Sequence, residues 1–176
     1  MKDGRSSLNK AIGILLILCS SQLYGEERNL RALMNWEAEG AIHSIGTNQM
    51  LFLGVMEGIL YVETEKGDLD GAFIECPVSQ KVNPESGESN ATGYCQITVG
   101  PEDVVYAEFD CDGEIGDCTG QFRLVEGSGR FEGVSGGSDI RIRSILGVLV
   151  KGMASGSLIR SGEGIALLPN LKVIVP

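Results

Sequence analysis

The chain has 176 residues and a formal net charge of −10, with 25 glycines, five cysteines and one histidine. This length suits one globular domain, and 43% apolar residues supply enough hydrophobic material for a core despite the glycine content. The negative charge argues against nucleic acids and anionic lipid surfaces as partners, because both would repel the protein. One histidine also excludes most familiar catalytic arrangements, so we predict neither a catalytic residue nor a cofactor.

The first 25 residues have the features of a secretory signal peptide. Lys2, Arg5 and Lys10 precede the apolar run Ala11–Cys19, and small polar residues lead to Gly25. The apolar run is too short for a transmembrane helix, which needs about 20 residues. Cleavage near Gly25 removes three bases and one acid, which changes the net charge from −10 to −12. We therefore predict a signal peptide at residues 1–25, no transmembrane span, and a periplasmic or secreted protein.

A second interpretation makes Cys19 the acylated N-terminus of a lipoprotein. Leu18 precedes this cysteine, at a position where a small residue is expected. Export without a lipid anchor is therefore favoured, and attachment through Cys19 is the alternative. In the favoured interpretation residues 26–176 form a single domain, which the resemblance described below implies to be a β-barrel.

Short β-rich runs separated by turn signals follow the export segment. One short helix is expected near Glu26–Trp36, before the first of these runs. The expected strands are Met50–Leu53, Gly58–Glu63, Ala72–Cys76, Gly93–Val99, Val104–Phe109 and Gly120–Val125. Asp139–Arg143 alternates between polar and apolar residues, and Ile165–Pro176 is expected to form the last strand. This spacing predicts an antiparallel all-β domain.

Four cysteines remain in the predicted domain, at Cys76, Cys95, Cys111 and Cys118. An even number in an exported protein favours two disulfides, and their spacing fits no zinc site. The preferred pairing is Cys76–Cys95 with Cys111–Cys118. The alternative is Cys95–Cys111 with Cys76–Cys118.

The expected hairpin turns give these cysteines a register. If Asn83–Glu88 is a turn, Cys76 and Cys95 face each other across two strands. Turns at Gly100–Val104 and Asp112–Gly116 extend the same reasoning to the other two cysteines. All four are then expected at one level of the sheet, within reach of a disulfide across each strand pair.

Acidic residues are concentrated between Lys81 and Arg123, where nine acids occur without a base. The simplest interpretation is a set of solvated, charged hairpin ends that discourage aggregation between sheet edges. Asp110, Asp112 and Asp117 also resemble the start of a calcium loop, because hard cations need several converging oxygen ligands. Calcium binding by these three aspartates is kept as an alternative, and no other metal site is expected.

One further pattern resembles a catalytic motif. Gly133–Gly137 matches G-x-S-x-G, the nucleophile elbow that needs a following helix and a histidine base. The segment after it looks like a strand, and the only histidine, His43, lies far upstream. We interpret Gly133–Gly137 as part of a glycine-rich turn and His43 as a structural residue on a strand.

The segment Gly120–Gly136, GQFRLVEGSGRFEGVSG, resembles the strand–turn–strand unit of the allene oxide cyclase and dirigent-like barrels. The resemblance implies an eight-stranded antiparallel barrel, often oligomeric, whose interior can hold an apolar molecule. Gly127 and Gly129 would permit positive φ values in the turn, and Phe131 would close the barrel end. Some members of that family cyclise an oxidised fatty acid, and others direct radical coupling.

Two functions are compatible with these patterns. The first is an exported, non-enzymatic barrel that binds a small apolar ligand or a protein partner, with a homo-oligomer as a further expectation. The second is an isomerase, cyclase or stereocontrol protein that acts on a hydrophobic substrate by confinement. No catalytic residue is carried over from the family, because no segment here matches its active-site strands. The volume and lining of the barrel interior distinguish these alternatives.

Overall fold

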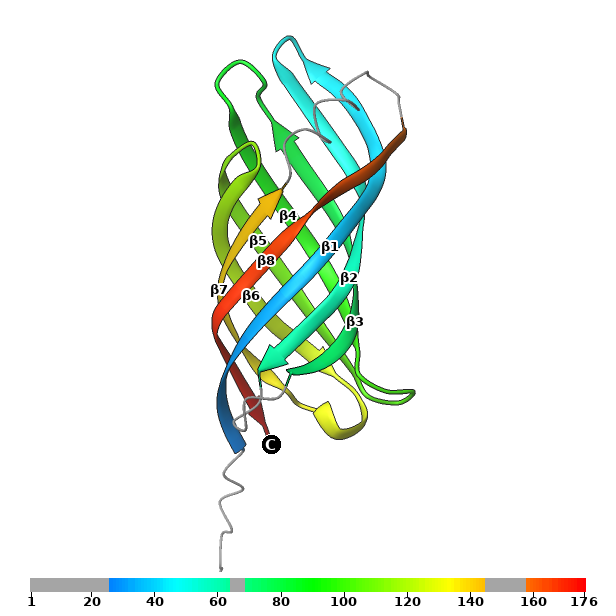
Figure 1. Cartoon of the computed structure of the whole chain (residues 1–176), viewed down its shortest axis with the longest axis vertical. Coiled ribbons are helices and arrows are strands. Elements are labelled where there is room, and N and C mark those ends of the chain that lie inside the picture. Colours follow the sequence, from blue (N-terminus) through cyan, green and yellow to red (C-terminus); the bar gives the residue numbers. More distant parts are fainter. Residues whose placement is uncertain (1–25, 64–68, 145–157) are drawn as a thin grey trace, which may run out of the picture.

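A computed structural model describes residues 26–63, 69–144 and 158–176, so the signal peptide and Cys19 lie outside the described residues. The strands form one closed antiparallel barrel, in which each strand pairs with the next and β8 pairs with β1 (Figure 1). The predicted all-β barrel is thus confirmed. The strands are β1 (Glu26–Gly46), β2 (Gln49–Glu63), β3 (Leu69–Val82), β4 (Glu88–Thr98), β5 (Val104–Glu114), β6 (Asp117–Gly127), β7 (Ser135–Ser144) and β8 (Leu158–Val175), with a short helix η1 (Gly129–Phe131) before β7.

The barrel has two ends that differ in their connections (Figure 1). We call the end with the β1–β2, β3–β4 and β5–β6 turns the hairpin end. The opposite end, where the start of β1 pairs with the end of β8, is the terminal end. The turn expected at Asn83–Glu88 lies at the hairpin end, and β8 confirms the strand expected at Ile165–Pro176.

The first strand shows that the helix expected near Glu26–Trp36 is wrong. β1 runs through this whole segment, with Ala32, Met34 and Trp36 buried and the residues between them exposed. From the sequence, the apolar pair Leu33 and Met34 is compatible with a helix as well as with a strand. In the structure Leu33 lies on the outer wall, with 38% of its surface exposed. The strand is favoured because β1 pairs with a neighbour along both of its edges.

Two expected runs, Met50–Leu53 and Gly58–Glu63, belong to one uninterrupted strand, β2. Gly54 and Gly58 therefore lie inside a strand and not at a turn. At Gly54 a Cβ would collide with the backbone of the neighbouring strand and with the ring of Phe52. Part of the glycine excess thus serves close packing inside the barrel.

Interior aromatic rings lie directly against glycines. A Cβ at Gly164 would lie 2.6 Å from Cζ2 of Trp36, and a Cβ at Gly93 would overlap the ring of Phe109. An eight-stranded barrel is only wide enough for side chains to fill it. The missing Cβ atoms therefore supply the space that these large rings occupy.

Both preferred disulfides are present. Cys76–Cys95 joins β3 to β4, and Cys111–Cys118 joins β5 to β6, with Cα–Cα separations of 4.1 Å and 5.6 Å. The register on either side of the first bond places Cys76 directly opposite Cys95, as expected. The alternative pairing is excluded.

The expectation that all four cysteines lie at one level is wrong. Cys95 lies opposite Ala107 and not opposite Cys111, because the β4–β5 loop lies earlier in the chain than the expected turn. Cys111 lies opposite Gly120, so its bond to Cys118 is diagonal. The β5–β6 turn also comes later than expected, since β5 extends to Glu114, inside the predicted turn, and β6 begins at Asp117.

The glycine-rich segment folds as a strand, a turn and a strand, as expected. Gly129, Gly133 and Gly136 have φ values of 60°, 75° and 129°, whereas Gly127 is not among the positive-φ glycines described. A Cβ at Gly127 would instead collide with the carbonyl oxygen of Phe131. Phe131 packs against the core at the terminal end, in agreement with its expected role there.

Candidate functional site

Buried side chains fill the barrel along its length, and a cavity of about 60 Å³ remains toward the hairpin end. Gly116 in the β5–β6 turn and Ser144 at the end of β7 lie at its rim. An engineered apolar cavity of about 150 Å³ binds benzene, so this cavity encloses only a few heavy atoms. Aromatic and aliphatic side chains dominate its wall, among them Trp36, Phe52, Met56, Val78, Phe109 and Ile142.

Trp36 gives this apolar wall a hydrogen-bond donor. Its Nε1 is buried and has no hydrogen-bond partner among the described residues, and the side chain is only 6% exposed. A buried indole N–H usually finds an acceptor, and an unsatisfied buried donor costs about 1–3 kcal/mol. The ring has room because Trp36 lies opposite two glycines, Gly58 on β2 and Gly164 on β8.

Two carboxylates, Glu114 and Asp117, line the cavity at the hairpin end. They lie opposite each other where β5 and β6 meet. Arg141 donates hydrogen bonds to Asp117 at 2.6 and 2.9 Å, and these bonds lower the pKa of the Asp117 carboxyl. Asp117 therefore stays ionised, and its charge is balanced by Arg141 and Arg143.

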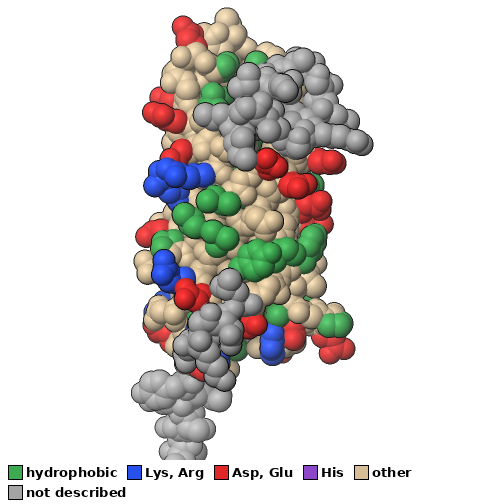
Figure 2. Space-filling model, viewed as in Figure 1, with side chains coloured by type: hydrophobic (Ala, Val, Ile, Leu, Met, Phe, Trp, Pro, Cys, Tyr) green, Lys and Arg blue, Asp and Glu red, His purple; other side chains and the backbone are tan. Residues whose placement is uncertain are grey.

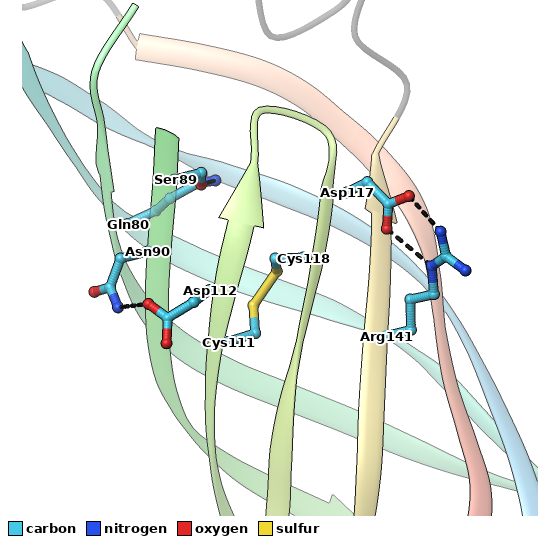
Figure 3. The surroundings of a disulfide bond; sticks show 8 residues. All are labelled: Gln80, Ser89, Asn90, Cys111, Asp112, Asp117, Cys118 and Arg141. Carbon is cyan, nitrogen blue, oxygen red and sulfur yellow. Dashed lines mark hydrogen bonds and ion pairs between the residues drawn. A yellow bond between two sulfur atoms is a disulfide. The ribbon is translucent and has the colours of Figure 1, made fainter. Parts of the chain in front are cut away.

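The hairpin end is held together by contacts between turns and between neighbouring strands, and Figure 3 shows the Cys111–Cys118 bond and the Asp117–Arg141 pair there. The backbone N–H of Ile115 donates to the carbonyl oxygen of Gly87, at 2.8 Å, and links the β5–β6 turn to the β3–β4 turn. The N–H of Ser144 donates to Gly116 at 2.9 Å and links the same turn to β7. The Cys111–Cys118 bond fixes β5 to β6 directly beside the cavity. The β5–β6 turn at the rim is therefore linked to the β3–β4 turn and to β7.

The calcium candidates are each engaged with a different partner. Asp110 forms an ion pair with Arg123 at 2.5 Å, and Asp112 accepts a hydrogen bond from Nδ2 of Asn90 at 2.5 Å. Asp117 is held by the arginines of β7. Within the described ranges no group of three or more His, Cys, Asp or Glu side chains is placed to hold a metal ion. Calcium binding stays a prediction, and it would require these partners to be displaced.

The nucleophile-elbow pattern and the histidine lie at opposite ends of the barrel. Ser135 begins β7 near the terminal end, and the residues after it form a strand, as expected. His43 is exposed on the outer wall of β1 near the hairpin end, opposite Leu51. The structure therefore does not bring these two residues together.

Trp36 is absent from the sequence-based candidates because its segment was expected to be helical. A usable signal was present, since Ala32, Met34, Trp36 and Ala38 alternate strictly with polar or exposed residues. Trp36 is also the only tryptophan in the chain. The orphaned N–H itself could not be predicted, because it depends on which strands flank β1.

Comparison of the chain with protein-family models, with curated proteins and with solved structures finds no match in any of the three. The resemblance of Gly120–Gly136 to the allene oxide cyclase and dirigent-like barrels therefore stays a prediction. The eight-stranded architecture that it implied is confirmed independently by the fold.

The compartment is constrained by the cysteine chemistry. Two disulfides indicate a non-reducing environment. No helix within the described part of the chain has the length and apolar character needed to cross a membrane.

Proposed function

We propose that this protein is an exported, non-enzymatic binding barrel whose cavity receives one end of a small, mostly apolar molecule carrying a hydrogen-bond acceptor. The observation that carries the proposal is the buried Nε1–H of Trp36, which has no acceptor among the described residues and belongs to the wall of the cavity. A carbonyl or ether oxygen placed against this N–H would satisfy the donor. The aliphatic and aromatic wall would hold the apolar part of the ligand.

The size and apolar wall of the cavity narrow the class of ligand. A volume of about 60 Å³ admits a small group, so the rest of the ligand extends toward the rim. A carboxylate would lose its hydration against the aromatic and aliphatic wall, which disfavours a charged group in the cavity. The expected ligand is therefore neutral, such as a short ketone or ester.

Export is supported by two independent features. Residues 1–25 have the charge and hydropathy pattern of a signal peptide, and the disulfides fit a non-reducing compartment. The protein would then act in a periplasm or outside the cell.

The alternative, a cyclase or isomerase acting on a hydrophobic substrate, has weaker support. Pockets for larger ligands typically have about 300–1,000 Å³, well above the volume of this cavity. The ionisable side chains among its described lining are Glu114 and Asp117, and hydrogen bonds from Arg141 keep the pKa of Asp117 low. A carboxyl group with a lowered pKa is ionised at neutral pH and is therefore a poor proton donor.

Fluorescence titration tests the proposed function, because the emission of the chain's single tryptophan reports on the cavity. The probes are 2-hexanone and hexanoate, which have similar length and differ in charge. We expect 2-hexanone to shift the Trp36 emission with a Kd of roughly 1 mM, as ligand efficiencies for such small molecules allow. Hexanoate should bind more weakly at pH 7 because its carboxylate would lose hydration against the apolar wall.

A cavity-filling variant and a matched control sharpen this titration. Ala38→Leu places a larger side chain in the cavity wall, whereas Ala41→Leu makes the same change on the outer face of β1. The first variant should lose the response to 2-hexanone and the second should keep it. Identical titrations for both variants, or no response in the wild type, would rule out binding in this cavity.

A further inference from the structure

The outer wall of β8, β1, β2 and β3 carries a continuous band of apolar side chains. Cross-strand pairing places Leu167, Leu33 and Tyr61 in one row across the strands. The next row contains Ile165, Asn35, Ile59 and Phe73. We call the six apolar residues of these two rows the apolar band. Leu33, Ile165 and Phe73 are 38–44% exposed, and Figure 2 shows apolar side chains gathered at mid-height on this face.

A row of four carboxylates borders this band. Glu163, Glu37, Glu57 and Glu75 lie directly opposite one another on the four neighbouring strands, one row beyond Ile165 and Phe73. We call them the glutamate row. No lysine or arginine side chain among those described lies within ion-pair distance of these residues. Like charges opposite one another destabilise a sheet, so the row is a cost to the isolated barrel.

At its β8 edge the band leads into a groove of about 430 Å³ between β6, β7 and β8. Its apolar part is formed by Ile140, Leu167 and Pro169, and its polar part by Thr119, Gln121, Asp139 and Arg141. The groove coincides with an interruption of the β7–β8 ladder, where Pro169 has no N–H to donate. The hydroxyl of Ser138 accepts the backbone N–H of Asn170 at 3.4 Å in place of a ladder bond.

We propose that this wall docks an amphipathic helix of a partner protein, with a basic edge over the glutamate row and an apolar face on the apolar band. Charge complementarity selects the occupant, because a lysine- or arginine-bearing edge would relieve the repulsion within the row. The apolar band would bury the adjacent face of the helix. A side chain from one end of the helix would enter the groove, as anchor residues do at protein interfaces.

The spacing of the wall matches a helix that lies across the strands. Neighbouring strands are about 4.8 Å apart, and successive turns of a helix are separated by about 5.4 Å. Because the wall curves around a closed barrel, a straight helix follows only adjacent strands, and basic residues one turn apart would lie near Glu37 and Glu57 at the centre of the row. This site is separate from the interior cavity and does not depend on the ligand proposed for it.

The test uses a synthetic 18-residue helical peptide with lysines along one edge and leucines along the adjacent face. A matched peptide has glutamates in place of the lysines. Fluorescence anisotropy of the labelled peptides with the folded protein should show binding of the lysine peptide and at least about tenfold weaker binding of the glutamate peptide. The difference should shrink as the salt concentration rises from about 0.05 M to about 0.5 M.

Paired variants locate the binding surface. Glu37→Gln with Glu57→Gln should weaken binding of the lysine peptide about fivefold, as expected for the loss of two exposed ion pairs. Glu126→Gln with Glu132→Gln changes the net charge equally, away from the row, and should have little effect. Phe73→Ser should weaken binding even at high salt, whereas Val125→Ser, at an exposed apolar residue on β6, should not.

Two results would overturn the proposal. One is equal binding of the two peptides, or equal effects of the two glutamate double variants, with thermal melting confirming that all variants are folded. The other comes from sedimentation of the protein alone. A dimer that Phe73→Ser dissociates would assign this wall to a second copy of the chain.

Discussion

The two sides of the barrel wall carry opposite arrangements of charge. On the side of β5, β6 and β7, arginines bridge carboxylates of neighbouring strands: Arg123 contacts both Glu108 and Asp110, and Arg141 contacts Asp117. On the side of β8, β1, β2 and β3, the glutamate row places carboxylates opposite carboxylates. The first side is compensated within the chain. On the second side Lys172 pairs with Glu27 farther along β8 and β1, but the glutamate row has no ion-pair partner among the side chains described.

This difference separates charge that supports the fold from charge that acts against it. Opposite charges across a strand pair contribute about 0.2–1 kcal/mol each, and like charges act against the sheet. Stability alone would favour basic residues within the glutamate row. The proposed docking of a basic helix would explain why the described row lacks them beside an exposed apolar band.

Removing the disulfides should have the largest effect and tests whether the two sides differ in covalent support. Cys76–Cys95 anchors β3, on the side of the glutamate row, and closes a loop with a sequence separation of 19. Cys111–Cys118 joins β5 to β6 on the arginine-bearing side and closes a loop with a sequence separation of 7. In the chain-entropy model, replacing both cysteines by serine should cost about 3 kcal/mol for the first bond and about 2 kcal/mol for the second. Urea unfolding of the two double variants measures this. A larger loss for Cys111→Ser with Cys118→Ser would contradict it.

Removing the Arg141–Asp117 pair from the compensated side should have a smaller, pH-dependent effect on stability. Hydrogen bonds from Arg141 lower the pKa of Asp117, so this pair stabilises the fold above the ordinary aspartate pKa. The contribution is lost as the pH falls through the lowered value in the folded protein. Arg141→Gln should therefore reduce the Tm at pH 7, with little difference from wild type near pH 2. Lys81→Gln removes a charge elsewhere, and an equal loss at pH 7 in both variants would show that net charge is responsible.

Removing one carboxylate from the glutamate row should have the smallest effect on stability, and this effect should be a gain. Glu57→Gln removes a carboxylate flanked by Glu37 and Glu75 on both neighbouring strands. It should stabilise the barrel by about 0.5 kcal/mol at low salt, and high salt should abolish the gain. Differential scanning calorimetry beside Glu126→Gln measures the difference. Destabilisation by Glu57→Gln would mean that the row is compensated after all.

The sequence was sufficient for the fold class and the cysteine pairing but not for the registers between strands. Cys76 and Cys95 flank a short, recognisable turn at Asn83–Glu88, so their opposition follows from local signals. Cys111 and Cys118 were paired correctly although their predicted register was wrong, because a diagonal pair is also close enough for a bond.

Features that depend on several strands could not be predicted. The glutamate row joins residues from four strands, and Glu163 is far from Glu37 in the sequence although the two lie opposite each other. Glycines inside strands, such as Gly54 and Gly164, were indistinguishable from turn glycines until the neighbouring rings were placed. The unsatisfied N–H of Trp36 depends on the same long-range closure of β1 against β2 and β8.

Nuclear magnetic resonance of the Trp36 indole most directly tests the claim that the cavity binds a hydrogen-bond acceptor. Because the chain has a single tryptophan, a ¹H–¹⁵N correlation spectrum contains one indole signal. Addition of 2-hexanone should move this signal downfield and slow its exchange with water, as Nε1–H gains an acceptor. An indole signal that stays unchanged at saturating 2-hexanone, while the protein remains folded, would contradict the proposed binding function.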